Sequence, residues 1–161
     1  MWIIELLACT GAGPAEPVSD AEAEPFACEL GVLREGSFVP LAEAETVELH
    51  LGFQGFLLLA LHARAEDPPT EVDATVGVTV DGLDPYSVSQ PRVAFTDGVT
   101  DELLVFLTSN YASWYEGRTA SLGLRLRSAD RVCVTEGAAV LVDEDPCIHT
   151  GGEPVCPDTG E

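Results

Sequence analysis

The segment VDATVGVTV, residues 72–80, decides the fold class because its hydrophobic and polar residues alternate without a break. The residues on one face are Val72, Ala74, Val76, Val78 and Val80. Successive side chains of a β-strand point to opposite faces, so this alternation is typical of a strand that covers a core with one side. The Asp-Gly pair at residues 81–82 predicts a turn directly after it.

Similar segments lie on both sides of this strand. We expect strands at residues 45–51, 56–65, 92–95, 103–107, 119–127 and 131–142. The run FLLLALHARA at 56–65 is apolar on both faces at its start, which is typical of a central strand covered on both sides. Residues 41–48 contain helix formers, but the alternation that follows favours a turn into a strand. The sequence therefore predicts an all-β domain over residues 26–145, an antiparallel immunoglobulin-like β-sandwich of about seven to nine strands.

Composition limits the function classes. The chain has 161 residues, of which 46% are hydrophobic, enough for one packed domain. Its 28 acidic and 7 basic residues give a formal net charge of −21. Such a charge argues against binding nucleic acid or an anionic membrane surface through a basic patch. A halophilic surface and an ordinary acidic exported protein both remain open as explanations.

Residues 1–25 differ from the rest of the chain. Residues 6–9, LLAC, resemble the lipobox of bacterial lipoproteins, in which two aliphatic residues and a small residue precede a Cys. The resemblance implies a truncated signal sequence over residues 1–9, a lipid on Cys9 and, because Thr10 follows, anchoring in the outer membrane. A start codon upstream of Met1 would explain why the segment before Cys9 is short. Residues 10–25 are rich in Pro, Gly and acids, and predict a disordered, flexible acidic linker.

The folded part carries a second resemblance. The segments EGSFVPL (35–41), ETVELHLGFQGFLLLALHARA (45–65) and GRTASLGLRL (117–126) are similar to exported lipoproteins of GC-rich Gram-negative bacteria. This likeness implies a cell-envelope location and carries no known activity.

The cysteines indicate an oxidising compartment. With Cys9 taken by the lipid, an even number remains: Cys28, Cys133, Cys147 and Cys156. The last two lie in the short loop CIHTGGEPVC of a Cys/Gly/Pro-rich acidic tail, residues 146–161. Cys28 and Cys133 begin the first and last strands, which often run parallel and adjacent in an immunoglobulin-like fold. We therefore expect disulfides Cys28–Cys133 and Cys147–Cys156, although alternation places Cys133 opposite its two Val neighbours.

The candidate binding loop is TSNYASWYEGR, residues 108–118. Its binding residues would be Asn110, Tyr111, Trp114, Tyr115 and Arg118. Tyr and Trp combine a large apolar face with a polar tip, which suits recognition of proteins or sugars. The alternative is that these rings fold over the open end of the core.

The evidence for catalytic or metal-binding residues is weaker than that for the loop. No hydrolase, metalloprotease or phosphate-loop signature is present, so we expect no catalytic residues and no cofactor. His50 and His62 are expected to be solvated on polar faces. Acidic loops at 81–84, 97–102 and 143–145 could hold Ca²⁺, although none matches the EF-hand pattern. Cys147, His149 and Cys156 could bind zinc, but in an exported protein a disulfide is favoured over a metal site.

The sequence as a whole predicts an exported, lipid-anchored, non-enzymatic structural or binding module at the bacterial cell envelope. Its partners would be the membrane, through the lipid, and an envelope protein or a glycan. One alternative is a calcium- or carbohydrate-binding adhesion module. The other is a metal-binding protein that uses the C-terminal Cys/His cluster.

Overall fold

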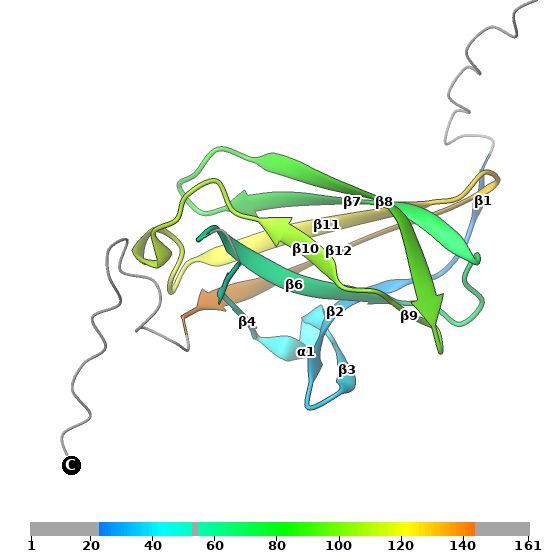
Figure 1. The fold of residues 1–161 in the computed structure, drawn as a ribbon, viewed down its shortest axis with the longest axis horizontal. Coiled ribbons are helices and arrows are strands. Elements are labelled where there is room, and N and C mark those ends of the chain that lie inside the picture. Colours follow the sequence, from blue (N-terminus) through cyan, green and yellow to red (C-terminus); the bar gives the residue numbers. More distant parts are fainter. Residues whose placement is uncertain (1–22, 53–54, 144–161) are drawn as a thin grey trace, which may run out of the picture.

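The alternating segment of residues 72–80 lies in strand β7 (Glu71–Val80) of a computed structural model that describes residues 23–52 and 55–143. Each of its five expected inward residues is at most 3% exposed. β7 pairs antiparallel with β8 on one side and β11 on the other, so it is central in the first of two β-layers (Figure 1). Local alternation was therefore sufficient to place these side chains in the core.

The two layers pack face to face. The first contains β8 (Tyr86–Thr96), β7, β11 (Thr119–Arg127) and β12 (Arg131–Val142), with the short strands β1 (Glu24–Pro25) and β4 (Thr46–Glu48) parallel to β12. The second contains β3 (Ser37–Pro40), β2 (Glu29–Arg34), β6 (Leu57–Arg64) and β10 (Leu103–Phe106), with β5 (His50–Leu51) and β9 (Val99–Thr100). All other pairings are antiparallel, which confirms the all-β sandwich. The described residues contain twelve strands, three of them with only two residues, and one-turn helices α1 (Leu41–Ala44) and η2 (Ala112–Trp114).

The core lies between the layers and is almost entirely aliphatic. β6 contributes a row of fully buried residues: Leu57, Leu59, Leu61 and Ala63, each 0% exposed. β11 supplies the facing row: Ala120, Leu122, Leu124 and Leu126. Burial of these rows removes the apolar face of each strand from water, which is the main force that holds the layers together. No helix within the described ranges is long and apolar enough to cross a membrane.

Two segments differ from the expected strands because the chain changes layers there. The strand expected at 45–51 is divided at Leu49, whose N–H donates to the Val142 carbonyl at 2.8 Å. β4 on one side of this point pairs with β12, and β5 on the other pairs with β6. The strand expected at 92–95 begins earlier, at Tyr86. Residues before 92 are polar and include Pro91, but pairing with β7 keeps them in the strand. Arg92 has a positive φ of 56° at an irregularity in this pairing.

The β2–β3 and β8–β9 hairpins close with the same type of turn. Glu35 and Gly36 between β2 and β3 have φ values of 52° and 77°, and Asp97 and Gly98 between β8 and β9 have 52° and 79°. Two successive positive φ values are the mark of the two-residue type I′ turn, which matches the twist of the flanking strands.

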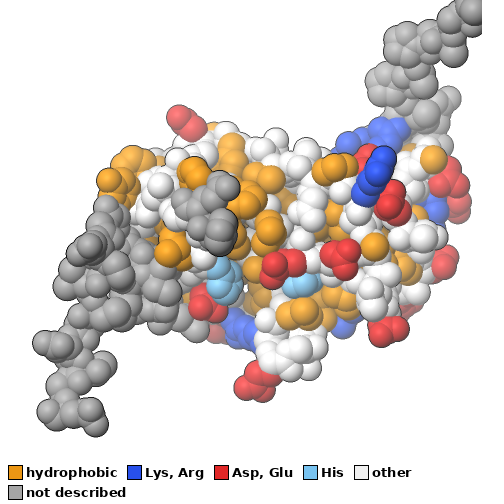
Figure 2. All heavy atoms as spheres, viewed as in Figure 1, with side chains coloured by type: hydrophobic (Ala, Val, Ile, Leu, Met, Phe, Trp, Pro, Cys, Tyr) orange, Lys and Arg blue, Asp and Glu red, His pale blue; other side chains and the backbone are white. Residues whose placement is uncertain are grey.

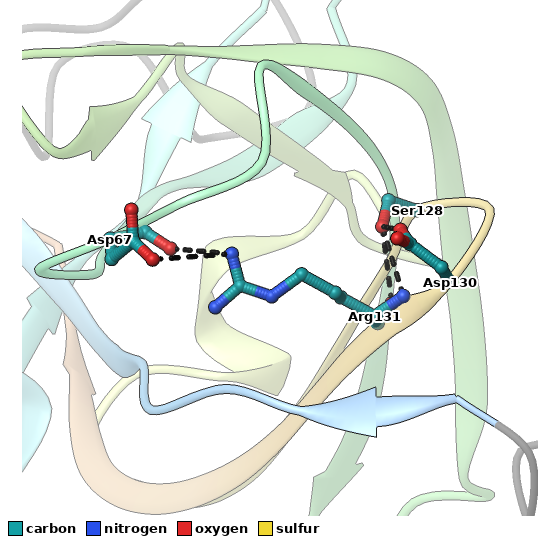
Figure 3. Close-up of polar contacts among 4 residues, drawn as sticks. All are labelled: Asp67, Ser128, Asp130 and Arg131. Carbon is teal, nitrogen blue, oxygen red and sulfur yellow. Dashed lines mark hydrogen bonds and ion pairs between the residues drawn. The ribbon is translucent and has the colours of Figure 1, made fainter.

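Arg131 stabilises the end of the sandwich that carries β1. Its guanidinium donates to the Asp67 carbonyl at 2.9 Å and lies 5.0 Å from the centre of the Phe26 ring. The Ser128 hydroxyl accepts from the Arg131 N–H at 3.1 Å and donates to Asp130, which closes the turn before β12 (Figure 3). The Glu24 N–H donates to the Asp130 carbonyl at 2.7 Å. Among the described residues, backbone pairing therefore includes Glu24, two residues before the expected domain start at Phe26.

The disulfide Cys28–Cys133 is present, as expected, and its Cα atoms are 6.1 Å apart. The chain passes from β1 in the first layer to β2 in the second across Cys28. Cys133 faces inward at 4% exposure, while its neighbour Val134 is 72% exposed. Alternation places Cys133 opposite its Val neighbours, which argues against a bond to Cys28. The bond forms because Cys28 lies at the crossing between the layers and belongs to neither β1 nor β2.

Candidate binding site

The candidate loop is anchored by one fully buried aromatic residue. Tyr115 follows η2 and is 0% exposed. Its hydroxyl accepts from the Ser109 N–H at 2.8 Å and shares a hydrogen bond with the Thr108 hydroxyl at 3.2 Å. The expectation that Tyr115 contacts a ligand at the surface is therefore corrected, because its ring covers the core and its polar tip is used within the loop.

Two other rings of the loop remain at the surface. Tyr111 and Trp114 are 51% and 52% exposed, and their ring centroids are 6.3 Å apart with a tilt of 32° between the planes. Asn110 beside them is exposed. Arg118 is partly buried, and its guanidinium donates to the Asp81 carbonyl at 2.7 Å, so it braces the loop against the turn after β7.

Two exposed residues lie outside the predicted loop. Phe56 and Phe106 are 44% and 47% exposed, and a Cβ added at Gly52 would lie 3.1 Å from the Phe56 carbonyl oxygen and 3.9 Å from the Phe106 ring. A hollow of about 390 Å³ runs between Phe56 and the segment from Thr108 to Tyr111. We call Phe56, Phe106, Tyr111 and Trp114 the aromatic end. Figure 2 shows hydrophobic side chains at the end of the sandwich that carries η2 in Figure 1.

Alternation could have identified one of these two residues. Leu103, Val105 and Leu107 alternate inward in the strand expected at 103–107, so Phe106 must point outward. No local pattern could have placed Phe56 beside the loop at 108–111, because their contact depends on the pairing of β6 with the segment after β10.

Tyr86 provides a contrast to Tyr115 that yields a stability prediction. Its hydroxyl is buried without a hydrogen-bond partner in the described chain, and burial, with a smaller effect of Tyr115, raises its pKa above the usual value. A buried hydroxyl without a partner costs about 1–3 kcal/mol, so Tyr86→Phe should stabilise the fold by about 1 kcal/mol. Tyr115→Phe deletes the same atom but leaves the Ser109 N–H unpaired, and should destabilise it by about 1–2 kcal/mol. Urea unfolding of both variants tests this; changes of the same sign would contradict it.

The metal and lipid sites are only partly covered by the structure. No group of three or more His, Cys, Asp or Glu residues in the described ranges is placed to hold a metal ion, and these ranges include the acidic loops at 81–84 and 97–102. Cys9, Cys147, His149 and Cys156 lie outside the described residues, as do two residues of the loop at 143–145. The lipid on Cys9, the second disulfide and a calcium site stay predictions.

His62 differs from its expected environment. It is on the outer face of β6, but it is only 8% exposed. Its Nδ1 lies 3.0 Å from the Thr100 carbonyl oxygen. The prediction of a solvated side chain was wrong, because the residue is nearly buried and its ring nitrogen is hydrogen-bonded to the Thr100 backbone.

Comparisons with known proteins add little. No family model matches the sequence, and no curated protein matches it. Two structures of the β-glucuronidase of Parabacteroides merdae, one with glycerol in the active site, are similar to 65% of this chain, with 16% and 15% sequence identity and TM-scores of 0.40 and 0.41. The similar part spans only 14% of the glucuronidase. At this level of similarity no property of the glucuronidase is transferred, and the absence of catalytic activity stays a prediction.

Proposed function

We propose that the protein is an exported, non-enzymatic binding module of the cell envelope that contacts its partner through the aromatic end. The observation that carries this proposal is the exposed ring pair of Tyr111 and Trp114 on a turn that Tyr115 anchors in the core. Exposed aromatic rings on an ordered turn lose little conformational freedom on binding, which favours affinity. The partner would be an envelope protein or a glycan.

The proposal includes a lipid on Cys9 and a flexible linker over residues 10–25, so that the sandwich is displayed at a distance from the membrane. The Cys28–Cys133 disulfide supports export, because such bonds persist mainly in oxidising compartments. The intact mass of protein purified from the membrane fraction of its native host tests the anchor. A chain that begins at Cys9 and carries the mass of acyl chains is the expected result.

Substitution of the ring pair tests the binding surface. Trp114 is the remaining Trp in a chain that begins at Cys9, and in the full chain with Trp2→Phe, so its fluorescence reports directly on the aromatic end. We expect fragments of peptidoglycan, lipopolysaccharide or a purified envelope protein to change this fluorescence with saturation. The binding found for any of these probes should weaken at least tenfold in Tyr111→Ala, because central aromatic contacts contribute about 1.4 kcal/mol or more.

Val134→Ala is the matched control, because Val134 is a more exposed apolar residue on the first layer. It should leave the affinity within about twofold of the parent. Equal losses in Tyr111→Ala and Val134→Ala, or no fluorescence change with any probe, would contradict a binding role for the aromatic end.

A further inference from the structure

A second concave surface lies on the outer face of the second layer. It is a groove of about 1060 Å³ and shares no lining residue with the hollow beside Tyr111. The groove exists because β2 pairs with β6 only as far as Gly31 opposite His62, after which β2 pairs with β3 alone. β5 resumes the pairing on β6 at Leu58. The outer face of β6 between these two points forms the floor.

His62 presents a hydrogen-bond acceptor to this groove. A carbonyl oxygen can only accept, so the Nδ1–H of His62 donates the hydrogen bond to Thr100. In this tautomer the lone pair is on Nε2, for which the described residues provide no hydrogen-bond partner. The residue is only 8% exposed, and it lines the groove. A fixed, nearly buried acceptor at the floor of a groove is suited to a ligand that carries N–H or O–H donors.

The charged groups around the groove are mainly acidic. Glu35, Glu48 and Glu102 line it from three separate segments of the chain. Arg34 is the single Arg among the lining residues, and its guanidinium is occupied by the carbonyls of Ala44 and Thr46 at 2.7 and 3.1 Å. Figure 2 shows both described histidines on this face with acidic side chains nearby. Arg34 keeps its positive charge, but the three carboxylates outweigh it, so the electrostatic field in the groove favours a cation.

The floor between these carboxylates is apolar. Leu58, Ala60 and Leu104 line it, and Leu58 is only 8% exposed. A hydrated metal ion would gain nothing from such a surface, whereas an alkyl chain would bury apolar area on it. Carboxylates on separate segments, an apolar floor and a buried acceptor together match an organic cation with more than one ammonium group.

We propose that this groove binds an aliphatic polyammonium ligand, with its alkyl chain on the floor and its ammonium groups at Glu48, Glu102 and the Nε2 atom of His62. Primary ammonium groups on alkyl chains come from two sources, a free polyamine and the side chains of a Lys-rich peptide, and the titrations below distinguish them. The proposal does not depend on the aromatic end, and the two sites can be tested in the same protein.

The test is calorimetric titration of the full chain with spermidine in 150 mM NaCl, which screens diffuse attraction to an acidic surface. We expect saturable binding with a 1:1 ratio, and a loss of about tenfold in affinity in the double variant Glu48→Gln/Glu102→Gln. Glu71→Gln is the control, because Glu71 is exposed on β7 in the other layer, and it should change the affinity less than twofold. Equal losses in both variants, or displacement of spermidine by Mg²⁺ at equal charge concentration, would overturn the proposal.

His62 and the source of the ligand are tested separately. The single variant His62→Ala should weaken spermidine binding by about threefold relative to the parent protein. If this variant does not fold, the ¹⁵N chemical shift of Nε2 in the parent protein decides: it moves with spermidine if the proposal is right and stays constant if it is wrong. An acetylated and amidated peptide, Lys-Gly-Lys-Gly-Lys, completes the titration. Tighter binding of the peptide than of spermidine supports a protein segment as the ligand, and the reverse order supports a free polyamine.

Discussion

Replacing Cys28 and Cys133 together with Ala should lower the free energy of unfolding by about 4 kcal/mol, because the bond joins residues 105 positions apart and closes almost the whole domain. The loss arises mainly in the unfolded chain, which gains the freedom that the cross-link removed. Urea unfolding in oxidising buffer measures the difference between parent and variant.

A reductant provides the control for this result. It should lower the stability of the parent protein by a similar amount and have much less effect on the variant, because the variant no longer has this bond to lose. If parent and variant unfold at the same urea concentration in oxidising buffer, the cross-link does not contribute to stability. Retention of the native near-ultraviolet circular dichroism in the variant would show that the layers still pack without the bond.

Gly31→Ala should destabilise the domain by about 3 kcal/mol, the upper part of the range for overpacking in a closed site. An added Cβ at Gly31 would overlap the Val39 carbonyl oxygen and lie 2.7 Å from the Phe38 ring. The oxygen belongs to the backbone of β3, which pairs with β2 at this point, so it can move only if the pairing is disturbed.

Gly123→Ala is the matched comparison, because Gly123 is also within a strand but no atom lies within 4 Å of its added Cβ. Alanine should stabilise the fold there by about 0.5 kcal/mol, since it reduces the freedom of the unfolded chain without strain. Thermal unfolding of both variants measures the contrast. Similar melting temperatures for the two would show that the region around Gly31 can rearrange.

The candidate site was only partly predictable. Composition and spacing drew attention to the loop at 108–118, because aromatic residues are rare in this chain and three of them fall there. They could not separate Tyr115, which anchors the loop, from Tyr111 and Trp114, which remain exposed. They also missed Phe56, which is brought to the loop by strand pairing across about fifty positions of sequence.

Local alternation predicted the all-β class and the inward faces of β7 and β11, and the positions of the first and last strands favoured the pairing of Cys28 with Cys133. These features depend on alternation within one strand or on the positions of the first and last strands, and both can be read locally. No local pattern showed where the chain changes layers, at Leu49 and Cys28, or where β2 leaves β6 to open a groove above His62. The reason is physical: such points depend on backbone hydrogen bonds between segments that are distant in sequence, and those partners exist only after the two layers have packed.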